Sequence, residues 1–254
     1  MITAGIDAGN QTVKAVILKD GAILGHSIAF VGADTEASAQ QALDEALKMA
    51  GLSRDEVGKV FSTGAGRKLV SFVAGNATET TCDARGAVWL LPATRTVIDV
   101  GAEEGRAVRC DAQGKVTDFS VNEKCGAGSG TFTEAMARAL EVSLEDFGQM
   151  SLRSQQNIQM NAQCVVFAES EVVSLIHAQT PKEDIARAVH DAIADRITSL
   201  THMVGMEKEV ALIGGVARNP GFVDALRRSL GCDISVPDDP QIVGALGAAL
   251  MAAG

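Results

Sequence analysis

Apolar residues near the N-terminus recur in short runs that turns interrupt. The run from Ile2 to Leu18 alternates loosely and is broken at Gly9-Asn10, a pattern that predicts two strands joined by a hairpin. The pair Asp20-Gly21 predicts a second turn, and residues 22–29 predict a third strand. The chain is therefore expected to open on three short strands.

The spacing of apolar residues then changes to that of a helix. Residues 35–51 predict a helix that ends at Gly51, and residues 57–63 predict a buried strand with a glycine turn after it. Strands and helices in this order indicate an α/β protein. The expected buried face of the helix consists of Ala42, Leu43, Ala46, Leu47 and Ala50.

The opening pattern occurs a second time. IDAGNQTVKAV at positions 6–16 aligns with IDVGAEEGRAV at 98–108, an offset of 92 residues, and Lys14 matches Arg106. Two copies of such a unit predict two similar lobes, not a solenoid. We expect lobe I at residues 1–92 and lobe II at 93–239, with a closing helix at 240–254 that packs back on lobe I.

The second half of the chain predicts mostly helices. One short buried strand, 210–213, is expected just before Gly214-Gly215. The helix expected at 130–142 has a buried stripe of Phe132, Ala135, Met136, Ala139 and Leu140. Further helices are expected from just after Cys164 to 178, at 183–204, at 221–231 after Asn219-Pro220, and at 241–253.

Composition narrows the functional classes. The 254 residues are 46% hydrophobic and 21% charged, with a formal net charge of -10 and aromatics at 4%. An acidic chain with few aromatics is a poor partner for nucleic acid. No apolar run reaches the roughly 18 residues of a membrane span, and the N-terminal stretch has no basic region typical of a signal peptide. The expected location is the cytoplasm, with no membrane partner.

Each copy of the repeat places an Asp-x-Gly turn between apolar strands, at Asp7 and at Asp99. Glycine lets backbone N–H groups approach phosphate oxygens, and an adjacent aspartate can hold Mg²⁺ through water. The glycine edge at Gly214-Gly215 offers a surface on which an adenine can stack. No Walker A motif occurs. Two such turns with a downstream Gly-Gly favour a nucleotide site.

A cysteine precedes a glycine run in VNEKCGAGSGTF, residues 121–132. Cys125 and Cys164 each stand just before a predicted helix, where partial positive charge favours a thiolate. A site of four thiolates, zinc or [4Fe–4S], would need a second subunit to supply the other two. From the residues alone, two unrelated buried cysteines are the simpler interpretation. Small buried or half-exposed thiols are expected at Cys82, Cys110 and Cys232.

These loops together resemble the sugar kinase, heat-shock protein and actin superfamily of ATPases. The resemblance implies two duplicated lobes of the ribonuclease H-like fold with a nucleotide cleft between them. It implies catalytic roles for Asp7, Asp99 and Glu103. The residues that it implies for nucleotide binding are Gly9, Asn10, Gln11, Thr12 and Lys14 in phosphate loop one, Gly101 and Ala102 in phosphate loop two, and Gly214, Gly215 and Asn219 in the adenosine loop.

Three further segments, NEKCGAGSGTF, NAQCVVFAESEVVSL and GALGAAL, resemble the activators of 2-hydroxyacyl-CoA dehydratases and the ATPase subunits of benzoyl-CoA reductases. That resemblance implies ATP, Mg²⁺ and a [4Fe–4S] cluster shared by two subunits, with Cys125 and Cys164 as this chain's ligands. It implies an ATPase that drives low-potential electrons into a catalytic acyl-CoA subunit in anaerobic aromatic degradation. The implied electron donor is reduced ferredoxin or flavodoxin.

Phosphate loop two departs from the activator pattern. The activators have Asp-x-Gly-Gly-Gln-Asp, whereas residues 99–106 read DVGAEEGR. This resembles a benzoyl-CoA reductase ATPase subunit more closely and favours a pseudo-symmetric heterodimer. The alternatives are a homodimeric activator of a 2-hydroxyacyl-CoA dehydratase and a sugar kinase of the same fold. A zinc-stapled dimer with a regulatory nucleotide site and a scaffold ATPase stay open as well.

Overall fold

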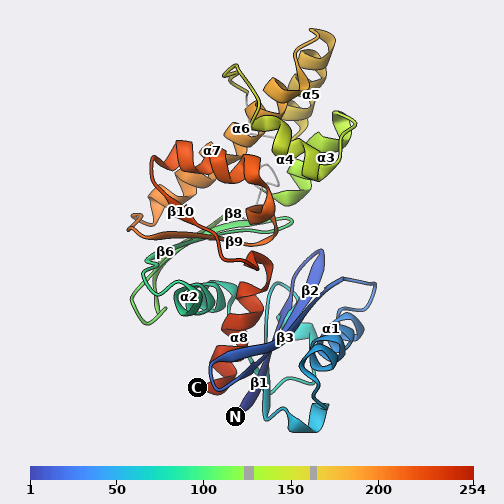
Figure 1. Cartoon of the computed structure of the whole chain (residues 1–254), viewed down its shortest axis with the longest axis vertical. Coiled ribbons are helices and arrows are strands. Elements are labelled where there is room, and N and C mark those ends of the chain that lie inside the picture. Colours follow the sequence, from blue (N-terminus) through green and yellow to red (C-terminus); the bar gives the residue numbers. More distant parts are fainter. Residues whose placement is uncertain (123–128, 161–164) are drawn as a thin grey trace. The chain divides into compact units, whose positions relative to one another are not determined.

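The computed structural model describes residues 1–122, 129–160 and 165–254 (Figure 1). The chain divides into two compact units. The first comprises residues 1–95, 110–117 and 237–254, and the second comprises 96–109 and 118–236. The lobe boundaries expected after residues 92 and 239 remain a prediction.

The first unit is built on one sheet with the strand order β3-β2-β1-β4-β5. Its strands are β1 (Ile2–Ala8), β2 (Thr12–Lys19), β3 (Ala22–Phe30), β4 (Lys59–Thr63) and β5 (Gly75–Asn76). Its helices are α1 (Thr35–Ala50), α2 (Glu79–Leu90) and α8 (Val243–Ala253), with the short 3₁₀ turns η1 (Arg54–Glu56), η2 (Arg67–Leu69) and η5 (Pro240–Ile242).

Alternation along β2 gives this sheet two buried faces. Ala15 and Ile17 point into a core with the apolar stripe of α1, whereas Val16 and Leu18 point into a second core with α8. Helix α8 is rich in alanine and glycine, and it packs against both β1 and α2. Gly51 ends α1 in the left-handed conformation at φ 67°, as the sequence predicts.

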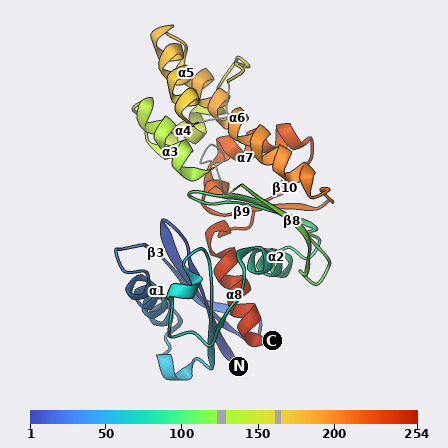
Figure 2. The ribbon, with the colours of Figure 1, turned by 180° about the vertical axis from the view of Figure 1, so that it is seen from behind.

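The second sheet has the order β10-β9-β6-β7-β8. Its strands are β6 (Thr96–Val100), β7 (Gly105–Cys110), β8 (Val116–Asn122), β9 (Val210–Ile213) and β10 (Ile234–Ser235). The helices are α3 (Gly130–Ala139), α4 (Leu144–Ser151), α5 (Val165–His177), α6 (Lys182–Met203) and α7 (Pro220–Leu230), with η4 (Gly215–Arg218). Figure 2 shows the same elements from behind.

The internal repeat seen in the sequence is also a repeat of topology. β1 and β2 form an antiparallel pair in which Asp7 is opposite Lys14, and β6 and β7 form one in which Asp99 is opposite Arg106. β4 then joins β1 in parallel, as β9 joins β6. The sequence offset of 92 residues therefore maps one strand-turn-strand unit onto the other.

Helices α3, α6 and α7 share one core with this sheet. Ile98 and Leu212 from the strands contact it, as do Phe132 and Met136 from α3. Helix α6 buries a long stripe, and α7 adds Phe222 and Leu226. No helix among the described residues is long and apolar enough to cross a bilayer.

One expectation about helices was wrong, and helices α2 and α4 were not expected. The helix expected at 130–142 ends at Ala139, which is exposed, and Glu141 takes a left-handed φ of 54°. A new helix, α4, begins after Ser143, whose hydroxyl caps it by accepting from the N–H of Asp146 at 3.0 Å. Helix α2 was not foreseen, because its apolar residues are small and its amphipathic pattern is weak.

Candidate nucleotide site

Loop one, residues 7–14, is the β1–β2 hairpin of the first unit. Lys14 Nζ lies 3.0 Å from Asp7 Oδ2, and both side chains are largely buried. The Gly9 N–H donates to the Thr12 carbonyl at 3.1 Å. A Cβ on Gly9 would lie 3.0 Å from that oxygen and 3.2 Å from Lys14 Nζ, so a side chain there would be crowded. Asn10 and Gln11 form its exposed tip.

The glycine turn after β4 packs against the end of β1. Gly64 has a φ of 91°, and a Cβ there would lie 2.5 Å from Asp7 Oδ1. The Gly66 N–H donates to the Ala8 carbonyl at 2.8 Å. The sequence predicts this turn but not its part in the site, since nothing local shows that it lies beside Asp7.

A second carboxylate lies close to Asp7. A Cβ on Gly244 would lie 3.4 Å from Asp83 Oδ1 and 3.6 Å from Asp7 Oδ2, so both acids face the same glycine of α8. Asp83 is 3% exposed and comes from α2, the helix that the sequence pattern does not reveal. Carboxylate oxygens beside a position without a side chain are a suitable donor set for a hydrated Mg²⁺.

Loop two, residues 99–106, is the β6–β7 hairpin of the second unit. Arg106 pairs with Asp99, and its Nη1 lies 3.1 Å from Glu104 Oε2. All three are at least partly buried, whereas Glu103 is exposed. The alignment of the two repeats matches Arg106 with Lys14, but the sequence alone does not show that Arg106 pairs with Asp99. The guanidinium offsets two of the negative charges that the sequence places in this loop.

The first turn of α3 is hydrogen-bonded to loop two. The N–H groups of Gly130 and Thr131 donate to the carbonyl oxygens of Gly101 and Ala102, each at 2.9 Å. N–H groups in the first turn of a helix have no acceptor within the helix, and here loop two supplies acceptors for these two.

The expected adenosine loop, residues 214–219, follows β9 and lies beside loop two. Gly214 has a φ of 88°, and a Cβ there would lie 2.5 Å from the Val100 carbonyl. A Cβ on Gly130 would lie 3.3 Å from Val216 Cγ2, so η4 also touches the start of α3. Loop two, the start of α3 and the adenosine loop therefore come together within the second unit.

Asn219 ends this loop and caps α7. Its side-chain Oδ1 accepts from the N–H groups of Gly221 at 3.0 Å and Phe222 at 3.2 Å. Its Nδ2 lies 3.0 Å from Nε2 of His190. The residue is only 9% exposed, so its amide is directed at the protein.

A model of the BadF/BadG/BcrA/BcrD ATPase family matches residues 4–252. The chain belongs to this family. The membership confirms the resemblance read from the phosphate loops and the cysteine segments. The α/β architecture and the actin and sugar-kinase type of fold are confirmed as well.

Individual members of the family differ in their likeness to this chain. The activator of lactoyl-CoA dehydratase from Anaerotignum propionicum is 39% identical over 99% of this chain and 97% of its own. A solved activator of the 2-hydroxyisocaproyl-CoA dehydratase from Clostridium difficile, with bound ADPNP, is 39% identical with a TM-score of 0.93, covering 99% and 94% of the two chains. A subunit of benzoyl-CoA reductase from Thauera aromatica is 33% identical over 99% and 93%.

The comparisons thus favour the activators over the benzoyl-CoA reductase type that loop two suggested. Over the whole chain the identity to the activators is higher, although the octapeptide at 99–106 differs from their pattern. A ROK family glucokinase from Streptomyces griseus is 14% identical with a TM-score of 0.64 over 100% of this chain and 99% of its own. That likeness shows the fold alone.

The cysteines expected to bind a cluster, Cys125 and Cys164, lie outside the described residues. The other three are ordinary thiols, as predicted: Cys82 and Cys110 are buried and Cys232 is half-buried. Burial raises the pKa of Cys82 to about 12, which makes it unreactive. Within ranges 1–122, 129–160 and 165–254, no three His, Cys, Asp or Glu side chains gather as a metal group.

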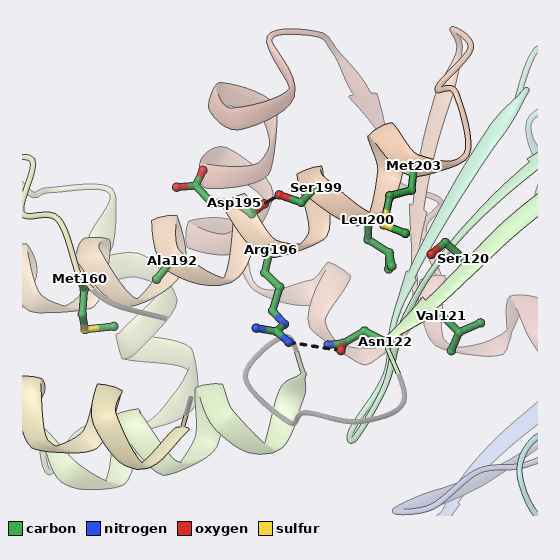
Figure 3. Close-up of a pocket in the computed structure, with 10 residues that line it drawn as sticks. All are labelled: Ser120, Val121, Asn122, Met160, Ala192, Asp195, Arg196, Ser199, Leu200 and Met203. Atoms are coloured by element: carbon green, nitrogen blue, oxygen red, sulfur yellow. Dashed lines mark hydrogen bonds between the residues drawn. The ribbon is translucent and has the colours of Figure 1, made fainter. Parts of the chain in front are cut away.

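A pocket of about 650 Å³ opens elsewhere in the second unit, between β8 and α6 (Figure 3). Arg196 points across it toward Asn122, with 3.5 Å between Nη2 and Oδ1. Met203 and Leu200 line its other end. None of the residues expected to bind nucleotide lines this pocket, so it is separate from the loops described above.

Proposed function

We propose that this chain is an ATP-hydrolysing activator that delivers low-potential electrons to a 2-hydroxyacyl-CoA dehydratase. Family membership and the greater likeness to activators support the proposal. The observation that carries it is the pair of hydrogen bonds from Gly130 and Thr131 to loop two. They connect a loop suited to phosphate with the helix that follows Cys125 in the chain.

In this proposal each loop offers groups suited to one part of a nucleotide. The N–H groups of Gly9 and Gly101 close their own turns, and other backbone N–H groups at the tips of the two loops would face phosphate oxygens. Gly214 and Gly215 present a flat edge to adenosine. Lys14 and Arg106 hold the carboxylates of Asp7 and Asp99 in place through ion pairs across each hairpin. The catalytic roles expected of Asp7, Asp99 and Glu103 belong to this proposal.

Asp7, with Asp83 beside it, is the donor set that would hold Mg²⁺ through water. When bound, Mg²⁺ would stabilise negative charge on the transferring phosphoryl group. The protein itself fixes the two carboxylates. Gly244 keeps the space between them clear, since any side chain there would enter it.

Cys125 and Cys164 are proposed to supply two thiolates, and a second copy of the chain two more, to a [4Fe–4S] cluster on the dimer axis. Such a cluster carries one electron at a time. Reduced ferredoxin or flavodoxin would be the donor, and the dehydratase subunits would be the acceptor. A copy of this chain is proposed as the dimer partner because the likeness to the activators is greater.

We propose that nucleotide binding or hydrolysis affects electron transfer through helix α3. A change in loop two moves the carbonyl groups of Gly101 and Ala102, and the N–H groups bonded to them move too. Helix α3 buries Phe132 and Met136 in the core, and we propose that a shift of its first turn is passed to the segment that precedes it. Exposure and amide hydrogen bonding around the thiolates would then change, and both set the potential of such a centre.

The test is anaerobic purification of the chain, followed by iron analysis, size determination and an ATP assay with a 2-hydroxyacyl-CoA dehydratase. An iron-containing homodimer that activates the dehydratase only with ATP supports the proposal. If activity required a second, different ATPase subunit, the result would favour a benzoyl-CoA reductase ATPase subunit. The sequence of loop two resembles that class. Colourless protein that consumes ATP only when a sugar is added would refute both.

A further inference from the structure

His190 on α6 is wholly buried and bonded at both ring nitrogens. Nδ1 lies 2.7 Å from the Ala186 carbonyl oxygen, and Nε2 lies 3.0 Å from Asn219 Nδ2. A carbonyl oxygen only accepts, so Nδ1 carries the proton and Nε2 is the acceptor. The imidazole is therefore neutral and in one tautomer.

The Asn219 amide has one orientation that satisfies all of its neighbours. The N–H groups of Gly221 and Phe222 only donate, so the atom facing them is Oδ1. Nδ2 must then face His190, which offers it the lone pair of Nε2. If the amide turned over, an NH₂ group would face two N–H donors and an oxygen would face a lone pair.

The surroundings leave this pair little freedom. The ring of Phe147 lies 4.7 Å from the imidazole centroid, tilted by 35°. A Cβ on Gly148 would lie 2.5 Å from Asn219 Oδ1, and one on Gly221 would lie 3.2 Å from His190 Cε1. Burial lowers the pKa of His190 to about 4, against the hydrogen bond to the Ala186 carbonyl and the charge of Asp191, which both raise it, while the charge of Arg228 adds to the lowering.

Asn219 is also part of the adenosine loop through its backbone. Its N–H donates to the Val216 carbonyl at 2.9 Å, which closes η4, and its carbonyl accepts from Val223 at 3.1 Å, inside α7. The side chain thus joins the loop to the helix, and His190 holds the side chain. His190 itself is wholly buried, so it acts on the loop only through Asn219.

We infer that His190 is a positioning residue for adenosine, which acts by holding Asn219 so that residues 214–219 keep their conformation. The inference rests on the proposed nucleotide site. It assigns Asn219 to the support of the loop, with adenosine recognised by the backbone at Gly214 and Gly215. Phosphate binding by the other loops is independent of this pair.

A matched pair of substitutions tests it. In His190→Gln the amide reaches the place of Nε2 and keeps an acceptor for Asn219, whereas in His190→Asn it reaches only the place of Nδ1. The control is His202→Asn, an exposed histidine on the same helix. Calorimetry with Mg²⁺ measures the Kd of ATP and of inorganic tripolyphosphate, which has no adenosine.

His190→Asn should raise the Kd of ATP by about tenfold, the effect of one lost hydrogen bond to a buried group. The Kd of tripolyphosphate should stay unchanged. His190→Gln and His202→Asn should bind both as the wild type does. Equal ATP affinity in the Gln and Asn variants, or an equal loss for both ligands, overturns the inference. If His190→Asn does not fold, His190→Phe takes its place. Failure of the wild type to bind ATP would overturn the proposed function, and with it this inference.

Discussion

The backbone N–H of Thr131 donates a hydrogen bond to the carbonyl oxygen of Ala102 across 2.9 Å. The neighbouring bond from Gly130 to Gly101 has the same length, so the first turn of α3 is held by loop two at two points. The first N–H groups of a helix normally have no hydrogen-bond acceptor within the helix. Here they attach the helix after Cys125 to the loop expected to bind phosphate.

Gly130→Pro should uncouple electron transfer from ATP hydrolysis. Proline replaces the N–H that reaches Gly101 with a ring carbon, which also forces the Gly101 carbonyl away, while proline itself suits the first position of a helix and the preceding Ser129 is already extended at φ -133° and ψ 170°. We expect electron transfer to the dehydratase to fall by about tenfold, the equivalent of roughly 1.4 kcal/mol, while ATP hydrolysis continues. The measurement is electrons transferred per ATP hydrolysed.

Gly130→Ala is the matched control, because it adds the same Cβ near Gly101 and Val216 and keeps the N–H. Equal coupling ratios in the two variants would show that this hydrogen bond does not transmit the nucleotide signal.

Arg106→Gln should destabilise the second unit more than Arg106→Lys. Glutamine leaves the buried Asp99 carboxylate without its ion pair, at a cost of about 3 kcal/mol. Lysine can pair with Asp99 as Lys14 pairs with Asp7, but it loses the bond to Glu104, so about 1 kcal/mol is expected. Urea unfolding of both variants measures the difference, and equal losses would argue against a role for the Asp99 pair.

Gly64→Ala should weaken both folding and ATP binding. The left-handed backbone disfavours alanine by about 1 kcal/mol, and its Cβ would also press on Asp7 Oδ1. Gly51→Ala is the control, because Gly51 is left-handed at φ 67° with open space around it. Only the first substitution should raise the Kd of ATP. A similar Kd in both would mean that Gly64 does not support Asp7.

Acid should destabilise the protein partly through His190. Its pKa is about 4 when folded and 6.5 when free, so between these values the unfolded state binds the extra proton. The stability that the neutral His190 contributes to the folded state is fully present above pH 6.5 and is lost as the pH falls toward 4. At roughly 1.4 kcal/mol per tenfold change in proton affinity, it amounts to about 3 kcal/mol.

Urea unfolding of wild type and His190→Gln between pH 4 and pH 8 isolates this contribution, since the other titrating groups are common to both. The difference in unfolding free energy between wild type and His190→Gln should change by about 3 kcal/mol between pH 4 and pH 8. A difference that does not vary with pH would contradict a neutral buried imidazole.

The sequence predicts the parts of this molecule whose pattern is local. The repeat at 6–16 and 98–108 gives both hairpins, because strand alternation and a glycine turn are visible within eleven residues. Helix α2 and its Asp83 escape prediction, since α2 is buried through small side chains and its neighbour α8 is distant in sequence. His190 is similar, because a lone histidine on a helix gives no sign that it faces Asn219.

The hydrogen bonds of the first N–H groups of α3 show a second limit of prediction from sequence. A glycine run before a helix predicts free N–H groups, but not which oxygen receives them. The carbonyls of Gly101 and Ala102 come from a different hairpin. Only the packing of α3 against the loop decides the pairing.

The most direct test of the account is electron transfer from the anaerobically purified chain to a 2-hydroxyacyl-CoA dehydratase, with and without MgATP, in wild type, Cys125→Ser and Cys164→Ser. The account predicts absorbance near 400 nm and ATP-dependent transfer in the wild type, and the loss of both in the two variants. Cys232→Ser should behave as wild type. Transfer that is equal with and without ATP, or that persists in Cys125→Ser, would contradict the account.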